Sequence, residues 1–242
     1  MQPRARRGAF GIPRELRRSW RPIVLAALML FLPMAGTWVA IVRQPELAPR
    51  LLPPGMLDRA QSARARERRG ESYLPQEEAQ IQGPLLSSLI TTNNIQVTFI
   101  AFAGGISAGV LTTVLLLSNG VSLGAGLGVF QSEGAVRSIL NFVAAHGVLE
   151  LTAICIAGGA GLLLGAAILM PGARTRRDAL VANGRRATTL IACSTILLLF
   201  AGLIEGNISP RPWPNEAKYF IALVTGLLML LWFTRGRGPV QN

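Results

Sequence analysis

The sequence predicts an all-α protein, a polytopic transmembrane helical bundle with about five to six crossings. Half of its 242 residues are hydrophobic and only 15% are charged. The charges lie in a few blocks between apolar runs that reach or approach the roughly 20 residues needed to cross hydrocarbon. A soluble domain needs no such runs, because its helices are apolar on one face only. Composition and patterning therefore indicate a membrane protein.

The net charge of +12 comes almost wholly from arginine, and the one lysine is Lys218. The arginines gather at the ends of apolar runs, where basic residues orient helices and contact anionic lipid. No basic face interleaved with aromatics is present, so lipid is an expected partner and nucleic acid is not. Cys155 and Cys193 lie inside apolar runs without metal-binding spacing, so no metal or other cofactor is expected.

The amino-terminal part predicts a basic cytoplasmic segment and then a retained membrane helix. Residues 1–22 hold seven arginines and one acid, and residues 23–42 form an apolar run. This run is longer than the apolar core of a usual signal peptide and ends without a small-residue cleavage site. Residues 43–94 follow as the largest extramembrane loop, nearly neutral and partly helical. Asn93 and Asn94 are expected to cap the next helix.

A helical membrane domain is expected over residues 95–233, followed by a short basic tail at 234–242. The segment 119–145 is apolar but contains five glycines, together with Gln131, Glu133 and Arg137. It is a re-entrant loop, two half-helices or one discontinuous crossing. The clear spans of the domain are predicted at 95–118, 147–170, 187–205 and 217–233.

Three basic segments with few acids bear on the number of crossings. They are the amino terminus, the loop at 171–186 and the carboxyl terminus. If all three face the cytoplasm, an even number of crossings must separate the first two. The clear spans supply three, so the interrupted segment is expected to supply a fourth, giving six crossings in the inner membrane with both ends in the cytoplasm. The arginines of the loop are Arg174, Arg176, Arg177, Arg185 and Arg186.

Small residues recur along the predicted spans. Such stripes let helix backbones approach closely, and a homo-oligomer is expected. For the glycines of 119–145, tight packing is favoured over a backbone-lined cavity. One stripe places small residues at every fourth position, in the order Ala153, Ala157, Gly161 and Gly165. The other candidate packing or conformational positions are Gly104, Gly105, Gly109, Asn119, Gly120 and Gly124.

One polar cluster is expected in the membrane domain. His146 is the only histidine, Glu150 follows it by one helical turn, and Glu205 ends a later span. With six crossings all three lie at the outer membrane face, with Asn207 nearby and Asn119 at the opposite face. An intramembrane charge needs a partner, water or a neutral form, so these residues are the first candidates for function.

Three interpretations of this cluster stay open. A His–Glu pair at a helix end is most often a structural hydrogen bond that fixes helix packing. It can also belong to a proton or ion pathway. The spacing of His146 and Glu150, with Glu205 as a third ligand, also suits a metal or hydrolytic centre. No HExxH motif, nucleophile elbow or phosphate-binding loop accompanies it, so no catalytic residue is assigned and an enzyme is not favoured.

A set of short motifs carries a resemblance to a known family. They are Asn119-Gly120, His146-Gly147 with Glu150-Leu151, and Glu205-Gly206. Over roughly residues 90–210 the chain resembles the stage II sporulation protein M family of integral membrane proteins. The resemblance implies a multi-spanning helical fold and a partner or scaffold role. In spore formers the named protein acts with two other membrane-anchored proteins in remodelling septal peptidoglycan, and relatives occur in organisms that make no spores.

The resulting functional hypothesis is a non-enzymatic component of a cell-envelope complex. Its expected partners are other membrane or envelope proteins, with a cytoplasmic ATPase as a candidate at the arginine loop. A small transporter or channel, lined by the His/Glu cluster, is the main alternative. A metal-dependent intramembrane hydrolase is the second.

Overall fold

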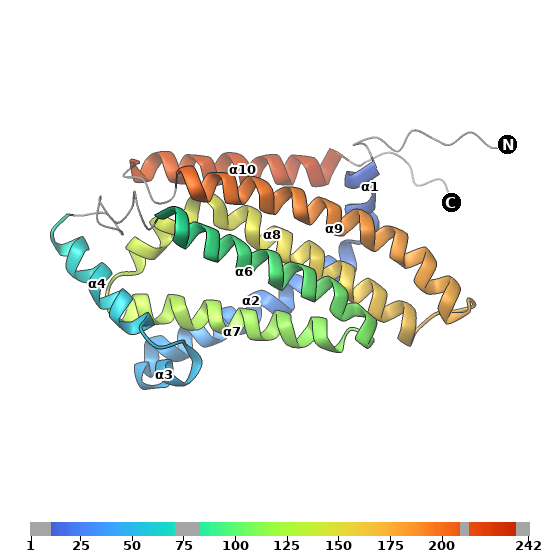
Figure 1. The fold of residues 1–242 in the computed structure, drawn as a ribbon, viewed down its shortest axis with the longest axis horizontal. Helices are drawn as coiled ribbons and strands as arrows, with labels where there is room; N and C mark the ends of the chain where they lie inside the picture. The colour runs from blue at the N-terminus through green and yellow to red at the C-terminus, as the bar shows by residue number, and fades with distance from the viewer. Residues whose placement is uncertain (1–10, 71–82, 209–212, 236–242) are drawn as a thin grey trace.

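The computed structural model describes residues 11–70, 83–208 and 213–235. Within these ranges the chain forms nine α-helices and two short 3₁₀ helices, and no strand. Six of the helices run side by side along the long axis of the molecule and alternate in direction (Figure 1). They are α2 (Trp20–Arg43), α6 (Gly83–Ala103), α7 (Val110–Ser132), α8 (Val136–Leu169), α9 (Arg176–Asn207) and α10 (Asn215–Arg235).

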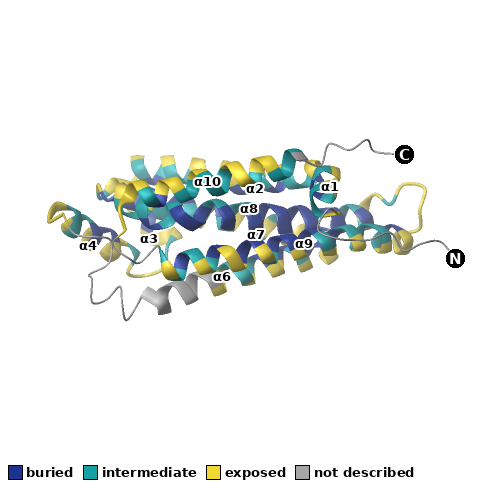
Figure 2. Cartoon of the chain, turned by 90° about the horizontal axis from the view of Figure 1, so that it is seen from above, coloured by how far each residue is buried: buried dark blue, intermediate teal, exposed yellow. Residues whose placement is uncertain are grey.

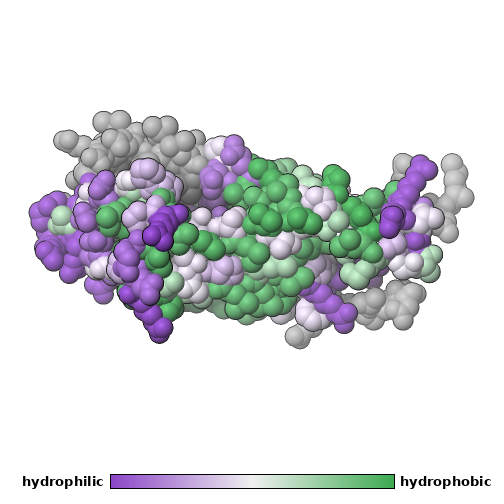
Figure 3. All heavy atoms as spheres, turned by 90° about the horizontal axis from the view of Figure 1, so that it is seen from below, coloured by the Kyte–Doolittle hydropathy of each residue, from purple (hydrophilic) through white to green (hydrophobic). Residues whose placement is uncertain are grey.

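Five of these helices, all except α6, stand out as long and apolar enough to cross a membrane. On the face that Figure 3 shows, apolar residues cover the middle of the molecule and polar residues gather toward both ends. Large apolar side chains of the long helices are exposed, among them Leu32 of α2 at 65% and Phe220 of α10 at 64%. Lipid is the solvent for such a surface, because water would penalise it. The prediction of an all-α polytopic membrane protein is confirmed.

Helix α8 forms the centre of the bundle (Figure 2). In its most apolar stretch 72% of the residues are buried, against 11% in α2 and 6% in α10. It packs on α9, α2, α6 and α10. Its 34 residues make a helix about 51 Å long, well beyond the ~30 Å of bilayer hydrocarbon. One long central helix is therefore shielded from lipid, while α2 and α10 carry the lipid-facing surface.

The chain turns back between α6 and α7. Here the 3₁₀ helix η2 (Gly104–Ser107) is followed by Ala108 and Gly109, which have φ angles of 57° and 83°. Left-handed backbone of this kind cannot continue a right-handed helix. The predicted span at 95–118 is therefore wrong, because its two halves belong to neighbouring helices of opposite direction.

The interrupted segment 119–145 contains the ends of two continuous helices. Its first part completes α7 and its last part begins α8, joined by a turn in which Gly134 has a φ of 72°. Of the three interpretations, two half-helices is the nearest to the observed structure, although each piece belongs to a longer continuous helix. Asn119 lies in the middle of α7 and not at a membrane face, so that expectation is wrong.

The predicted arginine loop is largely helical. Thr175 caps α9, since its side chain accepts a hydrogen bond from the backbone N–H of Asp178 at 3.1 Å. Helix α9 therefore begins at Arg176, eleven residues before the predicted start of the span at 187–205. Four of the five loop arginines lie on α9, and Arg174 alone precedes it.

The two ends of the bundle differ in what they carry. Helix α1 (Gly11–Arg18), the α8–α9 connection and the carboxyl end of α10 lie at one end, called here the arginine end (Figure 1). Between α1 and the α8–α9 connection the chain forms four long helices, α2, α6, α7 and α8. This number is even, so the two segments lie at the same end. The opposite end carries the cap, formed by η1 (Pro45–Leu47), α3 (Ala48–Leu51) and α4 (Met56–Arg68).

Glycines of α7 let it lie directly on α2. A Cβ at Gly120 would meet the carbonyl oxygen of Leu30, and one at Gly124 would meet that of Met34. Each pair advances by four residues, so the contact follows one face of both helices. At Gly126, on another face, a Cβ would meet nothing within 4 Å. Gly120 and Gly124 therefore serve close helix packing, as the sequence favoured.

The small-residue stripe of α8 is used inside the chain. A Cβ at Gly161 would meet the carbonyl oxygen of Ala101 in α6, and one at Gly165 would approach the backbone N of Gly109 at 2.7 Å. Gly105 in turn faces the backbone of Gly161. The stripe holds the α6–α7 turn against α8, so it is not a free surface for a second copy of the chain.

Candidate functional site

Three polar side chains meet inside the bundle, near the end that carries the cap. His146, Glu150 and Glu205 each offer one nitrogen or oxygen atom, and these atoms lie within 4.8 Å of one another. The three residues are 1%, 7% and 0% exposed. The sequence singled out all three, and the structure brings them together as the His/Glu cluster.

Helix geometry and packing place these side chains. His146 and Glu150 are one turn apart on α8, so both point to the same side. Glu205 comes from the last turns of α9, the helix that packs most closely on α8. Ser194 of α9 donates a hydrogen bond to the carbonyl oxygen of Ala153 at 2.6 Å. This buried contact helps to fix the register of the two helices, and with it the cluster.

The cluster lies far from the arginine end. Glu205 follows Arg186 on the same helix by nineteen residues, or about 28 Å of helix. This is close to the ~30 Å thickness of bilayer hydrocarbon. If Arg186 marks one edge of the apolar layer, the cluster lies at the other edge.

Two further polar residues reach the cluster from other helices. The Asn94 side chain of α6 forms a hydrogen bond with Glu150. Lys218 of α10 is only 7% exposed and interacts electrostatically with His146. Asn94 lies inside α6, so the expectation that it caps that helix is wrong. A lone lysine at the start of an apolar run was the signal available for Lys218, but its partner could not be predicted from spacing.

The pair of His146 and Glu150 is not a simple hydrogen bond. The Nε2 atom of His146 and the Oε2 atom of Glu150 are 3.9 Å apart, beyond hydrogen-bond distance. The other oxygen, Glu150 Oε1, is buried and has no hydrogen-bond partner among the described residues. The rings of Phe142 and His146 pack edge to face, with their centroids 5.9 Å apart. The site therefore holds an imidazole and two carboxylates, and Glu150 has an acceptor atom that no described residue uses.

The remaining predicted positions lie elsewhere. Asn207 is exposed, and its amide donates to the backbone oxygen of Leu203 in its own helix at 2.8 Å. Asn119 has a buried Nδ2 without a hydrogen-bond partner in the described part of the chain. Neither is among the residues that form the His/Glu cluster.

The arginines of the predicted loop divide into two groups. Arg186 forms an ion pair with Glu15 at 2.5 Å and donates to the hydroxyl of Ser19 at 2.8 Å. It thereby fastens α1 to α9. The exposed members are Arg174, Arg176, Arg177 and Arg185.

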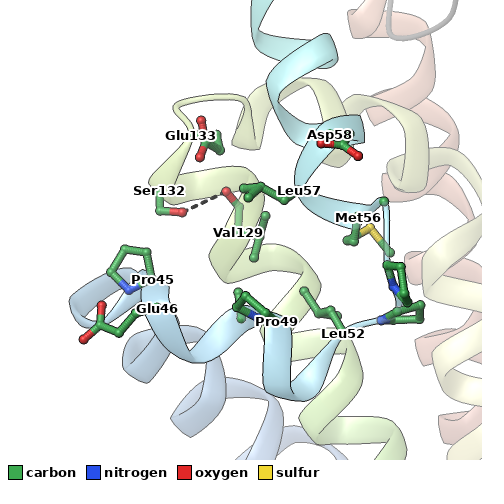
Figure 4. Close-up of a pocket in the computed structure, with 14 residues that line it drawn as sticks. Pro45, Glu46, Pro49, Leu52, Met56, Leu57, Asp58, Val129, Ser132 and Glu133 are labelled. Carbon is green, nitrogen blue, oxygen red and sulfur yellow. Dashed lines mark hydrogen bonds between the residues drawn. The ribbon is translucent and has the colours of Figure 1, made fainter.

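A second candidate site is a pocket of about 570 Å³ between the cap and the end of α7 (Figure 4). Apolar side chains, among them Leu52 and Met56, form much of its wall. Glu46, Asp58 and Glu133 add three carboxylates. No motif in the sequence predicted this pocket, because its walls come from segments about 75 residues apart along the chain.

Comparison with known proteins gives the family. The family described as stage II sporulation protein M matches residues 25–210, more than half of the chain. The chain belongs to this family. An uncharacterized protein of Methanocaldococcus jannaschii is 27% identical over 124 residues, which cover 50% of this chain and 70% of the relative. No solved structure gives a significant match. The matched region of this stage II sporulation protein M family member includes the cap, the His/Glu cluster and the α6–α7 turn.

Proposed function

We propose that this protein is a non-enzymatic component of a cell-envelope complex in the inner membrane. In this arrangement the arginine end faces the cytoplasm and the cap projects on the outer side. The cap gives a partner outside the cytoplasm a fixed surface on which to dock. Family membership supports a link of that complex to peptidoglycan remodelling.

The observation that carries this proposal is the firm attachment of the cap to the bundle. Arg64 of α4 donates a hydrogen bond to the carbonyl oxygen of Gly134 in the α7–α8 turn at 2.8 Å. Ser138 of α8 donates to Glu67 of α4 at 2.9 Å. Ala60 is fully buried in the apolar cluster beneath α4. A segment held in place in this way offers a partner a preformed surface, which lowers the ordering cost of binding.

The pocket under the cap indicates the chemistry of the partner. Its wall is largely apolar, and Glu46 and Asp58 on its rim are exposed carboxylates. A segment with apolar side chains and at least one lysine or arginine fits both features. We therefore expect the partner to insert a short basic and apolar segment into this pocket.

The closely packed bundle also supports a scaffold. Gly120 and Gly124 bring the backbones of α7 and α2 into contact, and Gly161 brings α8 onto α6. Contacts of this closeness leave no space for sliding between the helices. A scaffold benefits from such rigidity, whereas a carrier must rearrange its helices during transport.

Two further partners belong to this proposal. The exposed arginines of α9 offer an acidic cytoplasmic partner, such as an ATPase, a basic surface. The other partner is a second copy of the chain. It would use the exposed apolar faces of α2 or α10, because the small-residue stripe of α8 is already covered. These contacts are independent of the cap and need separate tests.

Affinity purification in mild detergent, followed by mass spectrometry, tests the cap. Wild-type protein should recover an envelope partner that the variant Leu52→Arg loses, because an added cation occupies the apolar wall. Val181→Arg, an exposed apolar position of α9 near the arginine end, is the matched control and should retain the partner. Equal recovery from both variants, or no envelope partner with wild type, would contradict the proposal.

A small transporter or channel is the second candidate function. The buried His/Glu cluster favours it, since ionisable residues within membrane proteins often mark proton or ion paths. Glu150→Gln keeps the size of the side chain and removes its charge. A proton-coupled carrier reconstituted in vesicles should lose pH-dependent flux in this variant, whereas a scaffold should keep its partners.

A further inference from the structure

We infer that His146, Glu150 and Glu205 form a structural binding site for one divalent transition-metal ion, with Zn²⁺ as the simplest fit. The site would join α8 to the end of α9 on the side of the molecule that carries the cap. This inference is independent of the scaffold proposal. It departs from the expectation of no metal, which rested on the absence of a Cys/His motif.

The donor set matches the coordination chemistry of such ions. Imidazole nitrogen and carboxylate oxygen are ordinary Zn²⁺ ligands, at about 2.0–2.2 Å from the ion. Two ligands of one tetrahedral ion then lie roughly 3.3 Å apart. The His146–Glu150 separation is 3.9 Å, and all three donors lie within 4.8 Å. Closing the site thus requires small side-chain rotations and no movement of the helices.

A second observation comes from hydrogen bonding. Glu150 Oε1 is buried without a hydrogen-bond partner among the described residues, and a buried carboxylate oxygen left in this way is costly. Coordination through both oxygens of Glu150 would use this atom and complete a fourth position. The Asn94 side chain forms a hydrogen bond with Glu150. It would therefore orient Glu150 as a metal ligand, as residues just outside a coordination sphere commonly do.

Charge also favours a bound cation. The carboxylates of Glu150 and Glu205 lie together in a buried position, with Lys218 nearby. A divalent cation held between the two carboxylates would offset their mutual repulsion, and only a metal ion uses the imidazole and both carboxylates together.

Burial indicates a structural rather than a hydrolytic role. Glu205 is 0% exposed and His146 only 1%, so the described structure has no open coordination position for a substrate. Catalytic zinc sites keep one position open to water, while structural sites are closed. The hydrolase alternative is therefore not favoured by this geometry.

The first test measures metal in the full-length protein. Protein purified in detergent without added chelator should contain close to one Zn²⁺ per chain by elemental analysis. Glu150→Gln and His146→Gln should lower affinity by at least about 100-fold, and Asn94→Ala by about 10-fold to 100-fold. Glu133→Gln, which removes an acid at the end of α7, is the matched control and should retain the metal.

A second measurement needs no variant, so it remains valid if a substitution prevents folding. Chelated wild-type protein titrated with Co²⁺ should develop the visible absorption of a four-coordinate ion, saturating at one equivalent. Zn²⁺ should then displace it and raise the unfolding temperature of the wild type. A monodisperse wild type with neither bound metal nor a Co²⁺ spectrum would overturn the inference. Metal retained in every variant would overturn it as well.

Discussion

Gly124 of α7 lies against the backbone of Met34 in α2, and a Cβ added to Gly124 would overlap the Met34 carbonyl oxygen. The obstacle is backbone, so it cannot rotate away as a flexible side chain would. The largest helix–helix contact of α2 therefore depends on the absence of a side chain at this position.

We predict that Gly124→Ala destabilises the bundle by about 1–3 kcal/mol, because the added methyl group must push α2 and α7 apart. Gly126→Ala is the matched control, two residues away on a face with open space. It should be neutral or stabilising by up to about 1 kcal/mol, owing to the better helix propensity of alanine. Thermal unfolding in detergent measures both. Equal stability of the two variants would contradict the packing role.

The hydrogen bond between α9 and α8 gives a second prediction. Ser194→Ala removes the buried donor to the carbonyl oxygen of Ala153 and should cost about 0.6–1.7 kcal/mol, the range for polar contacts between membrane helices. Thr188→Ala, on the exposed side of α9, is the control and should change stability little. Thermal unfolding in detergent compares the two variants. Equal stability of both would mean that this hydrogen bond does not stabilise the bundle.

Helix α1 should depend on Arg186. The ion pair with Glu15 is largely shielded, the two side chains being 21% and 16% exposed, so its loss should cost about 1 kcal/mol or more. Arg186→Ala should therefore release α1 and speed trypsin cleavage at Arg17 or Arg18. Arg185→Ala, an exposed neighbour, should leave the cleavage rate unchanged. If the two variants are cut at the same rate, α1 is held by other contacts.

Orientation in the membrane can be measured by cysteine labelling. The native Cys155 and Cys193 are only 6% and 1% exposed, so they should give little background. A cysteine at Ser132 should react with an impermeant maleimide added to intact cells from outside. A cysteine at Ala173 should react only after the membrane is opened. The reverse pattern would place the arginine end outside and contradict the proposed topology.

The local features of the protein could be predicted from its sequence. Apolar runs of sufficient length predict membrane helices, because backbone hydrogen bonds must be satisfied within hydrocarbon. His146 and Glu150 were predicted to share a face, since residues four apart in a helix do so. The arginines at the ends of apolar runs indicated which connections belong together, and the structure has an even number of long helices between the first two such segments.

The α6–α7 turn could not be located in this way. Gly104, Gly105 and Gly109 lie in an apolar run, where glycine is as common in close helix packing as in turns. Only the approach of this turn to Gly161 and Gly165 of α8 distinguishes the two. The same ambiguity placed the break of the chain in the segment that follows.

The sequence by itself determined the class of the protein, its helical membrane domain and the cluster formed by His146, Glu150 and Glu205. Tertiary structure decided what surrounds that cluster. Asn94 and Lys218 come from α6 and α10, far away along the chain, and the cap meets the end of α7 in the same long-range manner. Periodicity reports which side of a helix a residue occupies. It carries no information about which other helix lies on that side, since that depends on the packing of all six long helices together.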